Sequence, residues 1–209
     1  MRACLGIKSA RTTKKVVALT FDDGPSQYTK EILKVLEANN TKATFFVIGK
    51  NVIKYPQTVK EIHIKGNIVG NHTYSHPYLP NLSGDDIETE LTKNSSLIFR
   101  IIGFTPRLFR PPYGSCSVKS RIVAKNLGLI PIFWSSITDD YRYQLTTSTK
   151  ITLEIINLVR PGAIICLHDG GGNRKKTVEA LKIIIFILKN EGYEFLTIPE
   201  LLGIPAYES

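Results

Sequence analysis

Four residues in the first half of the chain have the types and spacing of a metal site with a base beside it. Asp22 and Asp23 are neighbours in TFDDGPS, directly after the apolar run 16–19. His72 and His76 are four residues apart in HTYSH. Two imidazoles and one carboxylate leave a fourth position open for water, which is the usual arrangement of a catalytic metal. Either aspartate can supply the carboxylate.

A cation also explains why two acids follow a buried strand, where like charges repel and are costly. One aspartate then neutralises the metal, and the other stays ionised and takes a proton from the activated water. Two structural alternatives stand beside this interpretation. Gly24 and Pro25 fit a simple turn before a helix N-cap, and H-x-x-x-H alone is a weak signal that a surface pair also produces.

Three further polar residues suit the same chemistry. His168 follows the apolar run 163–167 and is a candidate general acid, although a core histidine bonded to backbone has the same pattern. Arg110 stays protonated and offers two parallel donors, so it suits pinning a carboxylate. Asp140 can orient His168 and raise its pKa. Trp134 and Tyr141 are either core aromatics or stacking surfaces for a sugar.

Strand-like and helix-like segments alternate along the whole chain. The patterns predict strands over 15–21, 43–48, 67–71, 108–110, 129–134, 163–167 and 194–198. Helices are expected over 28–38, 52–65, 83–102, 117–126, 149–160 and 176–190, with Gly103 ending the third. Repeated β–α units indicate a parallel sheet covered by helices, and seven strands favour a barrel-like closure over an open sheet.

In either architecture the active site lies at the carboxyl ends of the strands. The polar residues that follow the expected strands are the ones singled out above, so they are expected to meet there. Three of the four histidines fall in these loops, and only His63 falls in an expected helix. Cys166 lies inside an expected strand and is most simply a buried small residue.

Taken in order, TFDDG, HTYSH, RPPYG, the Asp140–Tyr141 pair and His168 resemble the motifs of a known family. They are similar to those of the polysaccharide deacetylases with a NodB-homology domain, carbohydrate esterase family 4. The resemblance covers roughly residues 16–202. It implies an α/β fold, a distorted (β/α)7 barrel with the active site at the carboxyl ends of the strands.

The resemblance assigns a role to each matched residue. It implies that Asp22 is the general base and that Asp23, His72 and His76 hold the metal. The implied metal is Zn²⁺, or another divalent transition metal such as Co²⁺ or Ni²⁺.

It further implies that Arg110 orients the base and that the backbone N–H of Tyr113 stabilises the oxyanion. Asp140 is implied to orient His168, the general acid. The residues expected to contact substrate are Tyr113, Pro111, Trp134 and Tyr141.

The implied reaction is hydrolysis of the N-acetyl group of N-acetylglucosamine in peptidoglycan or a chitin-like polymer. Asp22 accepts a proton from the attacking water, and His168 donates one to the leaving amine. Three positions depart from the family pattern. Ile137 stands where an aspartate is frequent, Tyr141 where tryptophan is frequent and Cys166 where leucine is usual. We expect these departures to alter the pocket wall and the substrate preference, and to leave the metal and acid/base set intact.

Other functions fit parts of the pattern. An O-acetyl esterase acting on xylan would use the same site. A non-catalytic carbohydrate-binding or spore-structural protein would not need the base. The formal net charge of +9 suits an anionic partner, but no nucleic-acid-binding motif accompanies it, and solubility explains it as well. We therefore expect no nucleic-acid partner.

The 209 residues suit one compact domain. We expect a catalytic domain over 15–209, preceded over 1–14 by a basic segment of the kind that a linker remnant would leave. No apolar stretch is long enough to span a membrane and no signal peptide is visible. We expect a monomer whose partner is an acetylated polysaccharide. The resemblance implies an extracellular or cell-wall location.

Overall fold

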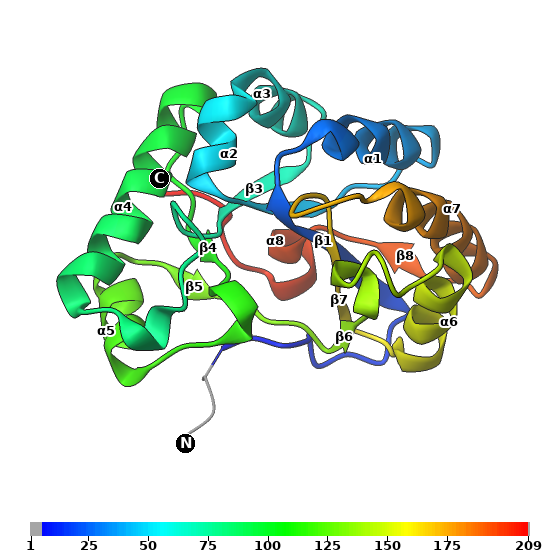
Figure 1. Cartoon of the computed structure of the whole chain (residues 1–209). Coiled ribbons are helices and arrows are strands. Elements are labelled where there is room, and N and C mark those ends of the chain that lie inside the picture. Colours follow the sequence, from blue (N-terminus) through cyan, green and yellow to red (C-terminus); the bar gives the residue numbers. More distant parts are fainter. Residues whose placement is uncertain (1–5, 209) are drawn as a thin grey trace.

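The computed structural model describes residues 6–208, and they fold around one curled parallel sheet (Figure 1). Every strand pair is parallel, and the strands run in the order β5-β4-β3-β2-β1-β7-β6, with β8 paired to the start of β1. The strands are β1 Val16–Gly24, β2 Thr44–Val47, β3 Ile68–Asn71, β4 Leu108–Phe109, β5 Ile130–Pro131, β6 Ser136–Ile137, β7 Ile164–His168 and β8 Glu194–Phe195.

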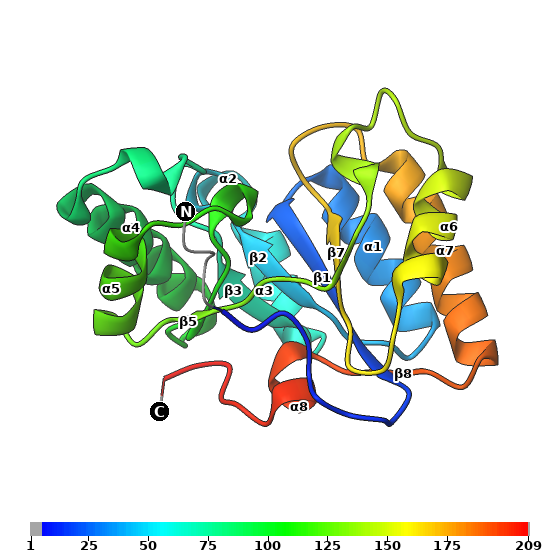
Figure 2. The same ribbon diagram turned by 90° about the horizontal axis from the view of Figure 1, so that it is seen from below.

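Helices cover the outside of this sheet. In Figure 2 the strands lie between α4 and α5 on one side and α1, α6 and α7 on the other. The α-helices are α1 Gln27–Ala38, α2 Gly49–Lys54, α3 Pro56–Ile64, α4 Gly84–Ile102, α5 Val118–Asn126, α6 Ser148–Leu158, α7 Lys175–Asn190 and α8 Ile198–Leu202. The seven parallel strands β1 to β7 curl as an incomplete barrel, and β8 lies off this path, paired to β1. This α/β fold confirms the predicted (β/α)7 architecture.

Side chains along β1 alternate between two hydrophobic clusters, one between the sheet and the outer helices and one inside the barrel. Val17, Leu19 and Phe21 belong to the cluster that packs under α1 and α7, whereas Ala18 belongs to the cluster inside the barrel. Because successive residues of a strand point to opposite faces, Thr20 and Asp22 follow Ala18 into the barrel interior. The strand therefore carries apolar side chains outward and brings polar ones into the interior at its carboxyl end.

The helix α8 closes the end of the barrel at which the strands begin. Ile198 is fully buried in the interior cluster, and its backbone N–H donates to the hydroxyl of Thr44, the first residue of β2. The amino ends of the strands are thus plugged by apolar packing. The carboxyl ends remain available for polar residues.

The helix expected over 52–65 and the strand expected over 129–134 differ from the structure, and one short strand was not predicted. The helix expected over 52–65 is two helices, because Pro56 begins α3 and forces Tyr55 out of helical geometry (φ −130°, ψ 52°). The strand expected over 129–134 shortens to β5, which pairs with β4 at Ile130 and Pro131 because β4 is itself two residues long. Ile132 forms only an isolated bridge with Ile7. β6 was not predicted at all.

The last expected strand also ends early. β8 stops at Phe195, and a capping box formed by Thr197 and Glu200 starts α8, which the sequence did not predict. The predicted end of α4 at Gly103 is confirmed, with that glycine in the left-handed conformation at φ 78°. Among residues 6–208, no helix has both the length and the apolar character needed to cross a membrane.

Candidate active site

The carboxyl ends of β1, β3, β4 and β7 meet around one cavity of about 430 Å³. Asp22 is directly opposite His168 in the β1–β7 register, and Asn71 is opposite Phe109 in the β3–β4 register, so the residues that follow these strands converge. The cavity is lined by Asp22, Asp23, His72, His76, Pro111, Tyr113, Gly114, Trp134, Ile137, Tyr141, His168, Gly171 and Arg174.

A break in the strand register lets both adjacent aspartates face the cavity. On a regular strand Asp22 and Asp23 would point to opposite faces of the sheet. The β1–β2 register shifts between Asp22 and Gly24, and Asp23 takes a left-handed backbone conformation with φ 71°. Its carbonyl accepts a hydrogen bond from Asn51 Nδ2 at 2.7 Å, which fixes the bulge.

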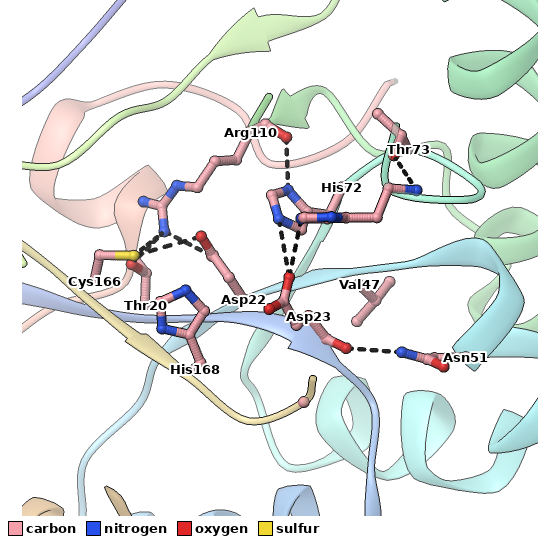
Figure 3. A network of polar contacts seen from close by, with 12 residues as sticks. Thr20, Asp22, Asp23, Val47, Asn51, His72, Thr73, Arg110, Cys166 and His168 are labelled. Carbon is pink, nitrogen blue, oxygen red and sulfur yellow. Dashed lines mark hydrogen bonds and ion pairs between the residues drawn. The ribbon is translucent and has the colours of Figure 1, made fainter. Parts of the chain in front are cut away.

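Asp23, His72 and His76 bring three potential metal ligands together. Asp23 Oδ1 lies 3.5 Å from His72 Nε2 (Figure 3). The same oxygen lies 3.2 Å from His76 Nε2. The other ring nitrogen of His72, Nδ1, lies 2.7 Å from the backbone carbonyl of Arg110, which orients the imidazole with Nε2 toward Asp23.

The donor set fits a divalent cation. The ligand atoms of the three residues all lie within 4.8 Å of one another. Asp23 Oδ1 is buried and makes no hydrogen bond with the described residues, an arrangement that is costly unless something else binds it. Burial raises the pKa of the Asp23 carboxyl, but the adjacent imidazoles of His72 and His76 outweigh this and hold the pKa well below its usual range. Asp23 is therefore ionised, as a metal ligand must be.

Asp22 lies beside this cluster and is held on both carboxylate oxygens. Arg110 Nη1 donates to Oδ1 at 2.7 Å, and the Cys166 thiol donates to Oδ2 at 3.4 Å (Figure 3). The same Arg110 nitrogen also donates to the Thr20 hydroxyl at 2.7 Å. Burial raises the pKa of the Cys166 thiol well above its usual value, so the thiol keeps its proton.

Arg110 is completely buried, which is unusual for a guanidinium and requires partners on every nitrogen. Its Nε donates to the Ile132 carbonyl at 3.2 Å, and its Nη2 donates to the Phe133 carbonyl at 3.0 Å. The residues between β5 and β6 therefore anchor the side chain that contacts Asp22.

His168 lies on the other side of Asp22 and pairs with Asp140. The ring Nδ1 lies 2.7 Å from Asp140 Oδ1, and the backbone N–H of His168 donates to Asp140 Oδ2 at 2.8 Å. Burial lowers the pKa of the imidazole, but Asp140, with smaller contributions from Asp23 and Asp22, raises it to about 9. With Nδ1 held by Asp140, Nε2 is the nitrogen left for a reacting group.

The aromatic residues form the wall of the cavity. Tyr113 and Tyr141 are 66% and 44% exposed, so neither is a core residue, and Trp134 is half-buried. Pro111 and Ile137 complete the apolar side of the lining. The sequence left open whether Trp134 and Tyr141 are core aromatics or exposed surfaces for a sugar. Their positions in the lining of the cavity favour the second alternative.

Gly170, in the loop after β7, packs directly against the backbone of Asp23. A Cβ at Gly170 would lie 2.0 Å from the Asp23 carbonyl oxygen, which cannot move without displacing the bulge. We expect Gly170→Ala to lower the free energy of unfolding by about 1–3 kcal/mol, measured by urea denaturation. Gly84→Ala is the matched control, since a Cβ there meets nothing within 4 Å; equal midpoints for the two variants would contradict the packing argument.

Comparison with known proteins identifies the family. The model of the polysaccharide deacetylase family matches residues 9–132, a stretch that contains Asp22, Asp23, His72, His76 and Arg110. The chain belongs to the polysaccharide deacetylase family.

Two relatives of this deacetylase-family chain are named for peptidoglycan. It is 37% identical over 190 residues to a peptidoglycan-N-acetylglucosamine deacetylase of Bacillus cereus, covering 90% of this chain and 68% of that protein. It is 38% identical over 198 residues to the peptidoglycan-N-acetylglucosamine deacetylase PgdA of Listeria monocytogenes, covering 94% of this chain and 41% of that protein. The chain thus spans less than half the length of the Listeria relative.

Solved structures agree with this family assignment. The Bc1960 peptidoglycan N-acetylglucosamine deacetylase superposes with a TM-score of 0.93 at 35% identity, covering 97% of this chain and 94% of that one. BA3943 of Bacillus anthracis, described as a pseudoenzyme of carbohydrate esterase family 4, superposes with a TM-score of 0.87 at 31% identity, covering 94% and 68%. Membership in the deacetylase family therefore includes both an enzyme and a protein described as a pseudoenzyme.

Sequence reasoning missed two buried residues of the site. Arg174, 2% exposed, donates from Nε to the Gly170 carbonyl at 2.5 Å and from Nη1 to the Asp140 carbonyl at 2.6 Å, so it ties two site loops together. Asp169 is fully buried and accepts a hydrogen bond from the Thr29 hydroxyl at 2.5 Å. The only sequence signal for Asp169 was its place after His168, and Arg174 had none.

Proposed function

We propose that this chain is a metal-dependent hydrolase that removes N-acetyl groups from N-acetylglucosamine-containing polysaccharide, with peptidoglycan as the first substrate to test. One observation carries this proposal. The Asp23–His72–His76 cluster lies at the same cavity as two ion pairs, Asp22–Arg110 and His168–Asp140. The names of the two bacterial relatives support the substrate class.

Asp23, His72 and His76 would hold the metal, which we propose to be Zn²⁺. When bound, such an ion polarises a carbonyl and makes water more acidic. Asp22 is the proposed base, because its carboxylate lies beside the three-ligand cluster without belonging to it. Arg110 keeps Oδ1 of this carboxylate in place, so the base is oriented before substrate arrives.

His168 is the proposed general acid on the opposite side of the cavity. Its raised pKa means that the imidazole is protonated at neutral pH and can donate a proton from Nε2 to the leaving amine. Asp140 fixes the ring and stabilises its charged form. Tyr113 would supply the backbone N–H that binds the oxyanion, and Trp134 and Tyr141 would contact the sugar.

We further propose that residues 15–209 form the catalytic domain, that the chain acts as a monomer and that it works at the cell wall. The names of the relatives support the location. Of the basic segment over 1–14, residues 1–5 lie outside the described residues. Ala10 N–H donates to the Gly162 carbonyl at 2.8 Å, so the described part of this segment packs on the domain.

The test is release of acetate from peptidoglycan, chitooligosaccharides and acetylxylan, with and without a chelator. We expect release from the N-acetylated substrates, its loss on chelation and its return when Zn²⁺ is added, because the three-ligand cluster requires an ion to be functional. Release from acetylxylan alone would replace the proposal with an O-acetyl esterase. No release from any of the three, with metal bound, would place this chain beside the proteins described as pseudoenzymes.

A further inference from the structure

The turn between His72 and His76 has an irregular backbone that needs support. It follows β3 directly and contains no helix or strand. Thr73 and His76 have φ values of 67° and 61°, in the left-handed region that costs free energy for residues with a Cβ. Such a conformation persists only where the surrounding structure fixes it.

Side-chain oxygens accept a hydrogen bond from every backbone N–H of this turn. Thr73 N–H donates to Asn71 Oδ1 at 2.8 Å, and His76 N–H donates to the Thr73 hydroxyl at 3.1 Å. The two N–H groups in the middle, those of Tyr74 and Ser75, both donate to Oε2 of Glu90, at 2.9 and 2.7 Å. The Ser75 hydroxyl donates to Oε1 of the same carboxylate at 2.7 Å.

Glu90 acts from a helix that is itself fixed to the sheet. It lies on α4, where Asn94 Nδ2 donates to the Val47 carbonyl at 2.8 Å and to Asn71 Oδ1 at 3.1 Å. On the opposite side of the turn, the backbone N–H groups at the start of α2 bind the carbonyls of Thr73 and Tyr74 at 3.0 and 2.9 Å. The turn is therefore clamped between α2 and one carboxylate of α4.

We propose that Glu90 is a positioning residue of the metal site, whose carboxylate fixes the turn that aims His72 and His76 at Asp23. The inference rests on the proposed function in one respect, namely that the two histidines are metal ligands. An ionised acceptor forms stronger hydrogen bonds than a neutral one. Without Glu90 the turn would have to be ordered when the metal binds, and part of the binding free energy would be lost to that ordering.

The experiment compares Glu90→Ala and Glu90→Gln with the wild type. Glu88→Ala is the matched control, because Glu88 is an exposed glutamate on the same helix. Three quantities are measured: the Kd for Zn²⁺ by competition with a chelator, amide hydrogen exchange of residues 73–76 in the metal-free protein, and the urea midpoint. We expect Glu90→Ala to weaken zinc binding by about 10- to 100-fold and to speed exchange at Tyr74 and Ser75.

Glu90→Gln keeps one acceptor oxygen, so we expect a smaller effect on both measurements. Glu88→Ala should leave both unchanged. This graded order distinguishes positioning from a general loss of stability, which would appear in the urea midpoint. If Glu90→Ala is too unstable to study, the comparison of Glu90→Gln with the control carries the test.

Two results would overturn the proposal: unchanged zinc affinity in the Glu90 variants, or unchanged exchange at Tyr74 and Ser75. If the wild type itself binds no zinc, the proposed metal chemistry fails instead. In that case the exchange measurement still decides whether Glu90 holds the turn.

Discussion

Asp23→Ala is expected to abolish tight zinc binding, whereas Asp22→Asn is expected to keep the metal and slow acetate release by about 10²- to 10⁴-fold. The two residues are adjacent in sequence but have different partners. Asp23 faces His72 and His76, so its removal leaves two ligands. Asp22 faces Arg110 and Cys166, so its neutralisation removes the proposed base and leaves the three ligands in place.

Asparagine is the right replacement at position 22. Its carbonyl oxygen can still accept from Arg110, so the buried guanidinium is not left unpaired, which alone would be strongly destabilising. The measurements are the Kd for Zn²⁺ and kcat/KM for a chitooligosaccharide. Asp85→Asn, on the exposed first turn of α4, controls for loss of a surface charge.

The opposite pattern would refute the assignment. Wild-type turnover by zinc-loaded Asp22→Asn would show that Asp22 is not the base. Full zinc affinity in Asp23→Ala would show that the metal binds elsewhere. A loss of both properties in both variants would indicate that the bulge in β1 collapsed, which the urea midpoint would reveal.

Removal of the Asp140 charge is the second change with a large expected effect. In Asp140→Asn the imidazole of His168 loses its principal source of charge stabilisation, while burial still favours the neutral form. We therefore expect the His168 pKa, about 9 in the metal-free wild type, to fall in the variant. Titration of the His168 ring by NMR in chelator-treated protein measures both values.

The direction in which Asp140→Asn changes the pH dependence of activity follows from the proposed role of His168 as a general acid. A general acid works when protonated, so kcat/KM should decline as pH rises through the pKa of His168. The decline should move to lower pH in Asp140→Asn, and the rate at neutral pH should drop by about 10²-fold or more. An alkaline limb that does not move, with the ring titration shifted, would show that His168 does not supply the proton.

The raised pKa of His168 also makes the free energy of unfolding depend on pH. The folded-state pKa of His168 lies above its ordinary value of 6.5, so protonation favours the folded state. This contribution is fully present below about pH 6.5 and is lost as pH rises through about 9. Urea unfolding at several pH values measures this effect. The free energy of unfolding should differ most between wild type and Asp140→Asn below about pH 6.5.

Local sequence signals predicted most of the elements because they depend on neighbouring residues. The apolar run of β1, the acidic first turn of α4 and Gly103 at its end were each legible in a short window. Pro56 carried an equally local signal and was overlooked, so one helix was predicted where there are two. The strands expected over 108–110 and 129–134 exist as β4 and β5, but each is only two residues long. The equally short β6 was missed, because two residues are too few for a periodic pattern.

The contacts of Cys166 show where sequence reasoning reached its limit. We expected this residue to alter only the pocket wall. In the structure its thiol donates to Asp22 and lies 3.6 Å from Arg110 Nη1, so it touches the proposed base and its partner. That contact depends on the register of β1 against β7, which places Cys166 opposite Thr20.

By itself the sequence determined the residue types of the site and the rule that brings them together. Parallel strands end at one edge, so the polar residues after them had to meet there. Only the tertiary structure decided which partners each residue contacts at that edge. The bulge at Asp23 turns two neighbouring acids into the same cavity, and the Glu90 carboxylate shapes the turn between His72 and His76. Both depend on hydrogen bonds between segments distant in sequence, which no local pattern encodes.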